Sequence, residues 1–253
     1  MSVDIGWLAA AVLLSIRVGA ATAFTSVLGP TALPGTVRVL LAASFGLLLT
    51  SATGVTAPAS GSVIGFAIAC TKEVLIGAAL AAGFLVAHAA TQVAGRMLDT
   101  QMGFGIASVF NPSAGTVSPL IGTLLGMAAI SVFLAMDGHH VLIRALALSV
   151  ETTPPGAPLK SFTWGNLFPQ AGIMFSYGLA LAAPVMFALL LADLALAVFA
   201  RSMPQLNIFV LGFAIKIMLG LVGLAASIQL TQTVFAGLFS ETFRYWERAA
   251  AGS

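Results

Sequence analysis

The chain has 253 residues, of which 59% are apolar and only 7% are charged, and its mean hydropathy is +1.06. A soluble domain carries about 25% charged residues, so the composition excludes an ordinary water-soluble enzyme, and so many apolar residues also exclude disorder. The net charge of +2 comes from scattered basic residues that form no run, so no nucleic-acid-binding surface is predicted. What remains is a protein that lies in a membrane or assembles against one.

Long apolar stretches recur along the chain, and a spanning helix needs about 20 such residues. Glycine, proline and small polar residues divide them. The predicted helices are, in chain order, 5–27, 36–52, 63–93 as one long helix or a hairpin, 96–110, 120–136, 170–200 and 205–236. The runs show no period of two, which strands would require, so we predict an all-α fold of polytopic, membrane-type helical hairpins.

Several charged residues lie within or beside these apolar stretches, where each would cost about 2.5–3.5 kcal/mol at the centre of a bilayer. They are Arg17, Arg38, Lys72 with Glu73, Asp193 and Lys216. So many charges do not suit simple lipid-exposed spans. Two explanations stay open: the charges line a polar pathway, or the helices pack among other subunits.

A polar break separates the last two long apolar stretches. Its residues are Arg201, Pro204, Gln205 and Asn207. Proline is suited to the first turn of a helix, where its missing N–H is not needed, and the two amides can donate hydrogen bonds to neighbouring helices. A helix–turn–helix with capped ends explains the same pattern without any functional role.

The segment 101–115 combines glycines and bulky apolar residues with an Asn-Pro pair. The residues of interest are Met102, Gly103, Phe104, Gly105, Ile106, Phe110, Asn111 and Pro112. Glycine weakens a helix and Asn-Pro favours a turn, so we predict a non-helical loop. At membrane depth such a loop must be buried in protein or line a cavity. It is either a plug that blocks a pore and swings aside, or a plain re-entrant turn.

No catalytic constellation is found: the chain has neither a Gly-x-Ser-x-Gly elbow nor a phosphate-binding loop, so we predict neither an enzyme nor a cofactor. His139 and His140 follow Asp137-Gly138, which raises the question of a metal site. Adjacent residues on a helix point in different directions, so the two imidazoles are not expected to face one ion. A polar helix end with a turn at Gly138 is predicted instead, and no metal site.

Short motifs stand in a fixed order from Arg17 to about Glu241. They are Arg17-Val-Gly, Val37-Arg-Val, Lys72-Glu-Val-Leu-Ile-Gly77, Gln101-Met-Gly-Phe-Gly105, Asn111-Pro112 with Gly115, Asp137-Gly-His139, and Pro204-Gln-Leu-Asn-Ile-Phe209 with Gly212-Phe213. Together they resemble the FliR family of bacterial flagellar export proteins, whose relatives are the SctT (YscT/SpaR) proteins of virulence secretion systems. The family usually has Asp-Pro at 111–112, and proline where this chain has Ala214, which should let the helix continue without a kink.

The resemblance implies a single export-gate domain over 1–253, with a FliP-like part at about 1–150 and a FliQ-like part at about 170–240. It implies a core subunit of the flagellar type III export gate in the bacterial inner membrane, at the flagellar basal body. There the family assembles with FliP and FliQ into a channel for unfolded substrates, with FlhB around its base, while a separate ATPase and the proton-motive force supply energy.

The resemblance also implies roles for the two unusual segments. The loop after Met102 resembles the family's plug, and the misplaced charges would be paired at subunit interfaces. The Met-Gly-Phe-Gly form resembles flagellar more than virulence members, so an SctT-type subunit is the first alternative. A less favoured alternative is an ion or solute transporter with Glu73, Asp193 and Lys216 as a relay, although the chain shows no convincing internal repeat.

Overall fold

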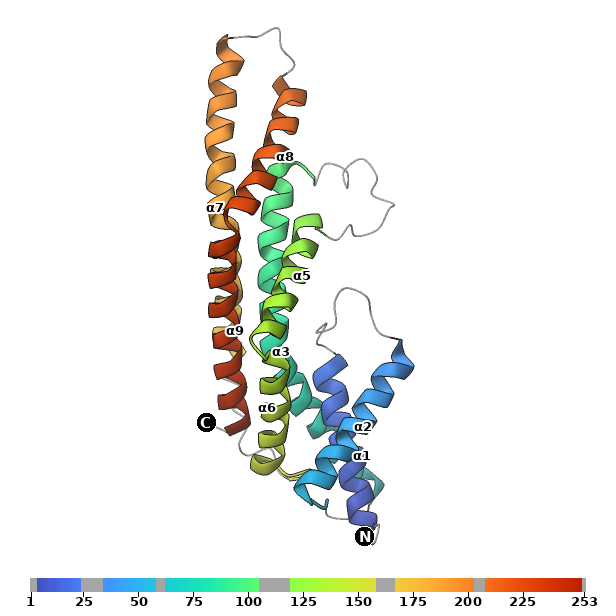
Figure 1. The fold of residues 1–253 in the computed structure, drawn as a ribbon. Coiled ribbons are helices and arrows are strands. Elements are labelled where there is room, and N and C mark those ends of the chain that lie inside the picture. The colour runs from blue at the N-terminus through green and yellow to red at the C-terminus, as the bar shows by residue number, and fades with distance from the viewer. Residues whose placement is uncertain are drawn as a thin grey trace. The chain divides into compact units, whose positions relative to one another are not determined.

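The computed structural model describes residues 4–23, 34–57, 62–104, 119–157, 167–202 and 208–251. Within these ranges the regular structure is helical and no strand occurs, which confirms the predicted all-α fold (Figure 1). The helices are α1 (Ile5–Ala23), α2 (Gly35–Thr53), α3 (Val63–Met102), α5 (Leu120–Ala135), α6 (Gly138–Thr152), α7 (Leu167–Ser202), α8 (Ile208–Ala226) and α9 (Ile228–Ala251).

The predicted helices omit α6, and the last of them ends at 236 whereas α9 continues to Ala251. Two further boundaries also differ. The separation of 63–93 from 96–110 is wrong, because α3 continues without a break for 40 residues to Met102. The predicted helix 205–236 is continuous through Ala214, as expected, but it is divided at Ser227, where α8 and α9 meet at 62°. The Ser227 hydroxyl donates to the carbonyl of Leu224 at 3.1 Å, and back-bonding of this kind bends helices.

The helices are of the membrane-spanning type. Within the described ranges, α1, α2, α3 and the 172–202 part of α7 are each long and apolar enough to cross a membrane. Two bent pairs, α5 with α6 and α8 with α9, reach the same criteria when each pair is taken together. Large apolar side chains such as Phe187, Val198 and Met218 are exposed, which requires lipid or partner subunits around them.

The chain forms two compact units, and the first consists of Met1–Ala87, Phe133–Ala171 and Phe239–Ser253. Aromatic residues build part of its core: Phe133 packs edge-on against Phe84, with ring centroids 5.5 Å apart. Trp246 Nε1 donates to the carbonyl of Leu80 at 2.7 Å, so this buried indole leaves no polar group unsatisfied. The end of α9 is thereby joined to α3 within this unit.

The second unit consists of His88–Val132 and Gly172–Leu238. Its helices approach closely at glycines: a β-carbon on Gly95 of α3 would overlap the backbone of Gly122 on α5. The start of α5 is held by Asp99, whose Oδ1 accepts a hydrogen bond from the Ile121 N–H at 3.2 Å. Both units are therefore built from segments that are far apart in the sequence.

Candidate functional site

The first unit contains a buried ion pair. Arg17 on α1 donates through Nε to Glu73 Oε2 on α3 at 2.6 Å, and the two side chains are 0% and 2% exposed. Burial of two charges is tolerated only when both are paired and their remaining hydrogen-bonding atoms are satisfied. The family resemblance implied pairing at subunit interfaces, whereas Glu73 has its partner, Arg17, within this chain.

The other nitrogens of Arg17 bind the end of α6. Nη1 donates to the Ser149 carbonyl at 2.8 Å and to its hydroxyl at 3.1 Å, and Nη2 donates to the Thr153 carbonyl at 2.8 Å. A cation is favoured there, because the last carbonyls of a helix carry partial negative charge. Glu73 Oε1 also accepts from the Gly156 N–H at 3.4 Å. One charge pair therefore holds α1, α3 and the end of α6 together.

Lys72, the neighbour of Glu73, is only half-buried. The ion pairs that the described residues form do not include it. The two adjacent side chains thus have different surroundings, as their angular separation on a helix predicts.

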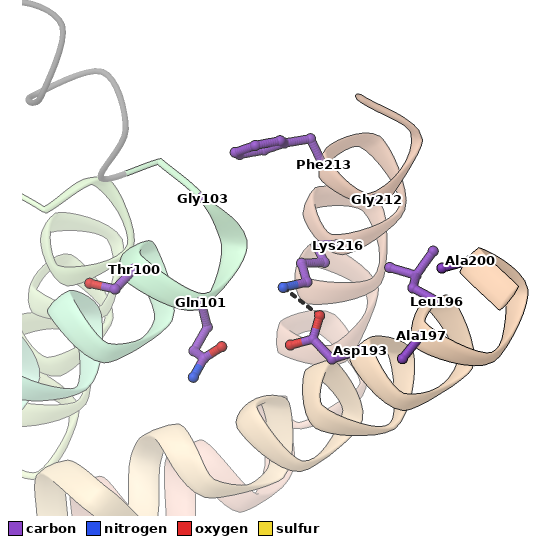
Figure 2. Close-up of a pocket in the computed structure, with 10 residues that line it drawn as sticks. All are labelled: Thr100, Gln101, Gly103, Asp193, Leu196, Ala197, Ala200, Gly212, Phe213 and Lys216. Atoms are coloured by element: carbon purple, nitrogen blue, oxygen red, sulfur yellow. Dashed lines mark ion pairs between the residues drawn. The ribbon is translucent and has the colours of Figure 1, made fainter. Parts of the chain in front are cut away.

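A second ion pair lies in a pocket of the second unit (Figure 2). Lys216 Nζ on α8 is 2.5 Å from Asp193 Oδ1 on α7, and the two side chains are 24% and 38% exposed, respectively. The pocket has a volume of about 450 Å³ and is completed by the end of α3, from which Thr100 and Gln101 come. Asp193 and Lys216, which the sequence marked as misplaced charges, therefore pair with each other within the chain, and both line this open pocket.

The end of α3 packs against α8. Met102 is fully buried, and a β-carbon on Gly220 would overlap its thioether. Gly103 ends the helix with φ +90°, a conformation that only glycine adopts without strain, and a β-carbon there would overlap the ring of Phe213. Met102 and Gly103, predicted as parts of a mobile plug, thus form the packed base of the segment that follows, and Phe104 is half-buried.

The remaining predicted residues divide into two groups. Arg201 is exposed in the last turn of α7, where a cation suits the helix end. The others lie outside the described residues: Gly105, Ile106, Phe110, Asn111, Pro112, Pro204, Gln205 and Asn207.

Sequence reasoning missed several polar residues that the fold uses. Ser149 and Thr153 contact Arg17 although they lie 132 and 136 residues after it in the sequence, and no local pattern predicts such a contact. Asp99 was detectable as an acidic residue near the end of a long apolar helix, three residues after Arg96. It is 6% exposed, and its Oδ2 has no hydrogen-bond partner among the described residues.

The prediction that His139 and His140 point apart is wrong. Their ring centroids are 4.0 Å apart, with the planes at 38°. Asp137, which precedes α6, adopts φ +56°, and the two helices that it joins meet at 69°. The side chains of Asp137, His139 and His140 therefore gather at one bend of the first unit.

Replacing Gly103 by alanine is expected to lower the melting temperature of the purified protein. The positive φ costs about 1–3 kcal/mol in a residue other than glycine, and the overlap with Phe213 adds to this. Gly172→Ala is the matched control, because a β-carbon on Gly172, within α7, meets nothing within 4 Å. Adding Phe213→Ala should recover only the part due to overlap. Equal melting temperatures for the two glycine variants would contradict the required conformation.

Comparison with known proteins places these features in a family. The chain matches the family model described as bacterial export proteins, family 1, over residues 8–242. The flagellar biosynthetic protein FliR of Pectobacterium carotovorum is 37% identical over 173 residues, which cover 68% of this chain and 66% of that protein. The FliR of Caulobacter vibrioides is 29% identical over 233 residues, or 91% of this chain and 93% of that protein.

A virulence protein is also similar. The Yop proteins translocation protein T of Yersinia pestis is 32% identical over 157 residues, which cover 58% of this chain and 60% of that protein. The resemblance inferred from short motifs is confirmed by matches that extend along nearly the whole chain. With a family match from residue 8 to residue 242 on an all-helical, membrane-type chain, this protein belongs to the bacterial export proteins of family 1, the FliR family.

Proposed function

We propose that this protein is a core subunit of the flagellar type III export gate. In this proposal it forms, with FliP-like and FliQ-like subunits, the channel through which unfolded flagellar proteins cross the inner membrane at the basal body, and an FlhB-like subunit surrounds the base. The observation that carries the proposal is the family match over residues 8–242, together with relatives named flagellar biosynthetic protein FliR.

The surface of the chain supports assembly with other subunits. In the most apolar 18-residue stretch of α7, only 28% of the residues are buried within the chain. Most of this stretch is therefore available to lipid or to partner subunits. Asp193 lies on this helix and is partly exposed. A charge pair amid apolar surface is better accommodated between protein subunits than in hydrocarbon, where it is costly.

The loop after Gly103 is the proposed plug of this channel, through Phe104, Gly105, Ile106 and Phe110, with Asn111-Pro112 at its return. The rigid packing of Met102 under α8 supports this role, because a loop that moves needs a fixed base. The protein itself performs no chemistry in this proposal. Energy comes from a separate ATPase and the proton-motive force.

Two alternatives make different predictions. A virulence-type subunit is suggested by the similarity to the Yersinia translocation protein, and it would leave motility intact when the gene is deleted. A transporter using Glu73, Asp193 and Lys216 as a relay is less well supported. Glu73 is bound by Arg17, and Asp193 is paired with Lys216, so each charge already has a partner.

The test is a mass measurement on the detergent-extracted complex after co-expression with FliP-like, FliQ-like and FlhB-like neighbours. We expect one large hetero-oligomer that contains a single copy of this chain, and a chain that behaves poorly when it is expressed alone. The large apolar side chains that the isolated chain exposes explain both outcomes, because partner subunits would cover them. A well-folded monomer or homodimer that gains no partners would overturn the proposal, and binding of a small solute by that species would favour the transporter.

A further inference from the structure

The bend between α5 and α6 gathers three side chains that ligate metals. Asp137, His139 and His140 each offer one ligand atom, and these atoms lie within 4.8 Å of one another. The proposed export function leaves this cluster without a role, since it belongs neither to the loop after Met102 nor to the Arg17–Glu73 or Asp193–Lys216 pair.

The backbone at the bend produces this arrangement. Asp137 adopts φ +56°, which is uncommon for a residue other than glycine. Its carbonyl accepts a hydrogen bond from the His140 N–H at 2.9 Å in the first turn of α6, and its Oδ1 pairs with His140 Nδ1. Gly138 packs against Phe133 so closely that a β-carbon would overlap the ring, which fixes the position of the turn.

The distance between Asp137 and His140 fits a shared ion. Asp137 Oδ1 and His140 Nδ1 are 3.3 Å apart. Two ligand atoms on a tetrahedral ion with bonds of about 2.1 Å lie about 3.4 Å apart. Both side chains are also accessible, since they are 73% and 70% exposed, so an ion can enter from solvent.

His139 supplies an independent observation. Its Nδ1 is buried and has no hydrogen-bond partner within the part of the chain that the structure describes. A buried polar atom without a partner is rare in native proteins and calls for an explanation such as an ion. Its ring lies beside that of His140, with centroids 4.0 Å apart, so the two imidazoles can approach one ion after small side-chain rotations.

We propose that Asp137, His139 and His140 bind one divalent transition-metal ion of the zinc class, with water completing the coordination. Imidazole nitrogen favours zinc, copper and nickel over magnesium and calcium, which prefer oxygen ligands. The ion joins Asp137, which precedes α6, to the first turn of that helix and takes part in no reaction. This site is independent of the proposed export function.

The test is a calorimetric titration in which zinc chloride is added to the full-length protein. The protein is purified within its complex and is first treated with a chelator. We expect one saturable zinc site per chain that is absent for magnesium chloride. His139→Ala and His140→Ala should each weaken zinc binding by about 100-fold, the upper end of the losses seen even for outer-shell changes. Zinc should also raise the melting temperature of the wild type and of neither variant, because an ion that binds only the folded state stabilises it.

His88→Ala is the matched control, since it removes the remaining histidine, a half-buried residue on α3. It should leave zinc affinity unchanged. Absence of saturable zinc binding in the wild type would overturn the proposal. Wild-type affinity in both the His139 and His140 variants, or an equal loss in the His88 variant, would overturn it as well. Melting curves without zinc confirm that each variant is folded, so a loss of binding reports the site.

Discussion

Glu73→Ala is expected to destabilise the protein by about 3–5 kcal/mol, because it leaves the charge of Arg17 buried without its partner. The same change removes the acceptor of the Gly156 N–H. The yield of assembled complex, and the melting temperature of what is recovered, should both fall. Glu247→Ala is the matched control, since Glu247 is exposed near the end of α9 and surface changes stay within about 0.5 kcal/mol.

Two further variants separate charge from packing. Glu73→Gln keeps a hydrogen-bond acceptor for Arg17 but removes the charge, so its effect should be intermediate. Arg17→Met combined with Glu73→Met removes both charges, and its loss should be smaller than the sum of the single losses, since the two residues are in contact. Equal effects of Glu73→Ala and Glu247→Ala on complex yield would refute the importance of the buried pair.

Shortening the loop within 105–112 is expected to leave the complex assembled and to let small ions leak across the membrane. This follows from the proposed plug, whose bulky residues would no longer fill the channel. Replacing Phe104 and Phe110 together by alanine should give a milder leak. The measurement is ion conductance, or sensitivity to small solutes, in cells that carry the shortened loop in an otherwise complete export apparatus.

A control deletion distinguishes a plug from a structural turn. Removing as many residues from the segment 158–166, which lies between α6 and α7 in the sequence, should produce no leak. If the 105–112 loop is only a turn, its shortening should disrupt the complex without a leak. A tight membrane with a normally assembled complex would contradict the plug.

The Arg17–Glu73 and Asp193–Lys216 ion pairs show what the sequence predicts and what it does not. Each charge was recognisable as misplaced in an apolar stretch, because hydropathy is a property of a local window. The partners were not recognisable, since Arg17 and Glu73 are 56 residues apart and the sequence holds no signal for that contact. Subunit interfaces were the expected place for partners, whereas Glu73 and Asp193 have theirs within the chain.

Local backbone conformation decided the other differences. The rule that adjacent helical residues diverge failed at His139 and His140, whose rings lie 4.0 Å apart in the first turn of α6, just after the positive φ of Asp137. The break at Ser227 was missed because serine is common within helices, so the sequence carries no signal for a bend there.

The sequence by itself determined that this protein is all-helical and membrane-type, with most helices other than α6 close to their observed positions. The physical reason is that apolar runs, and the glycines and prolines that divide them, act over neighbouring residues. Only the tertiary structure decided which charges pair, how α3 ends under α8, and that Asp137, His139 and His140 meet at one bend. These outcomes depend on close packing between helices far apart in the chain, and on single backbone angles that residue type does not specify.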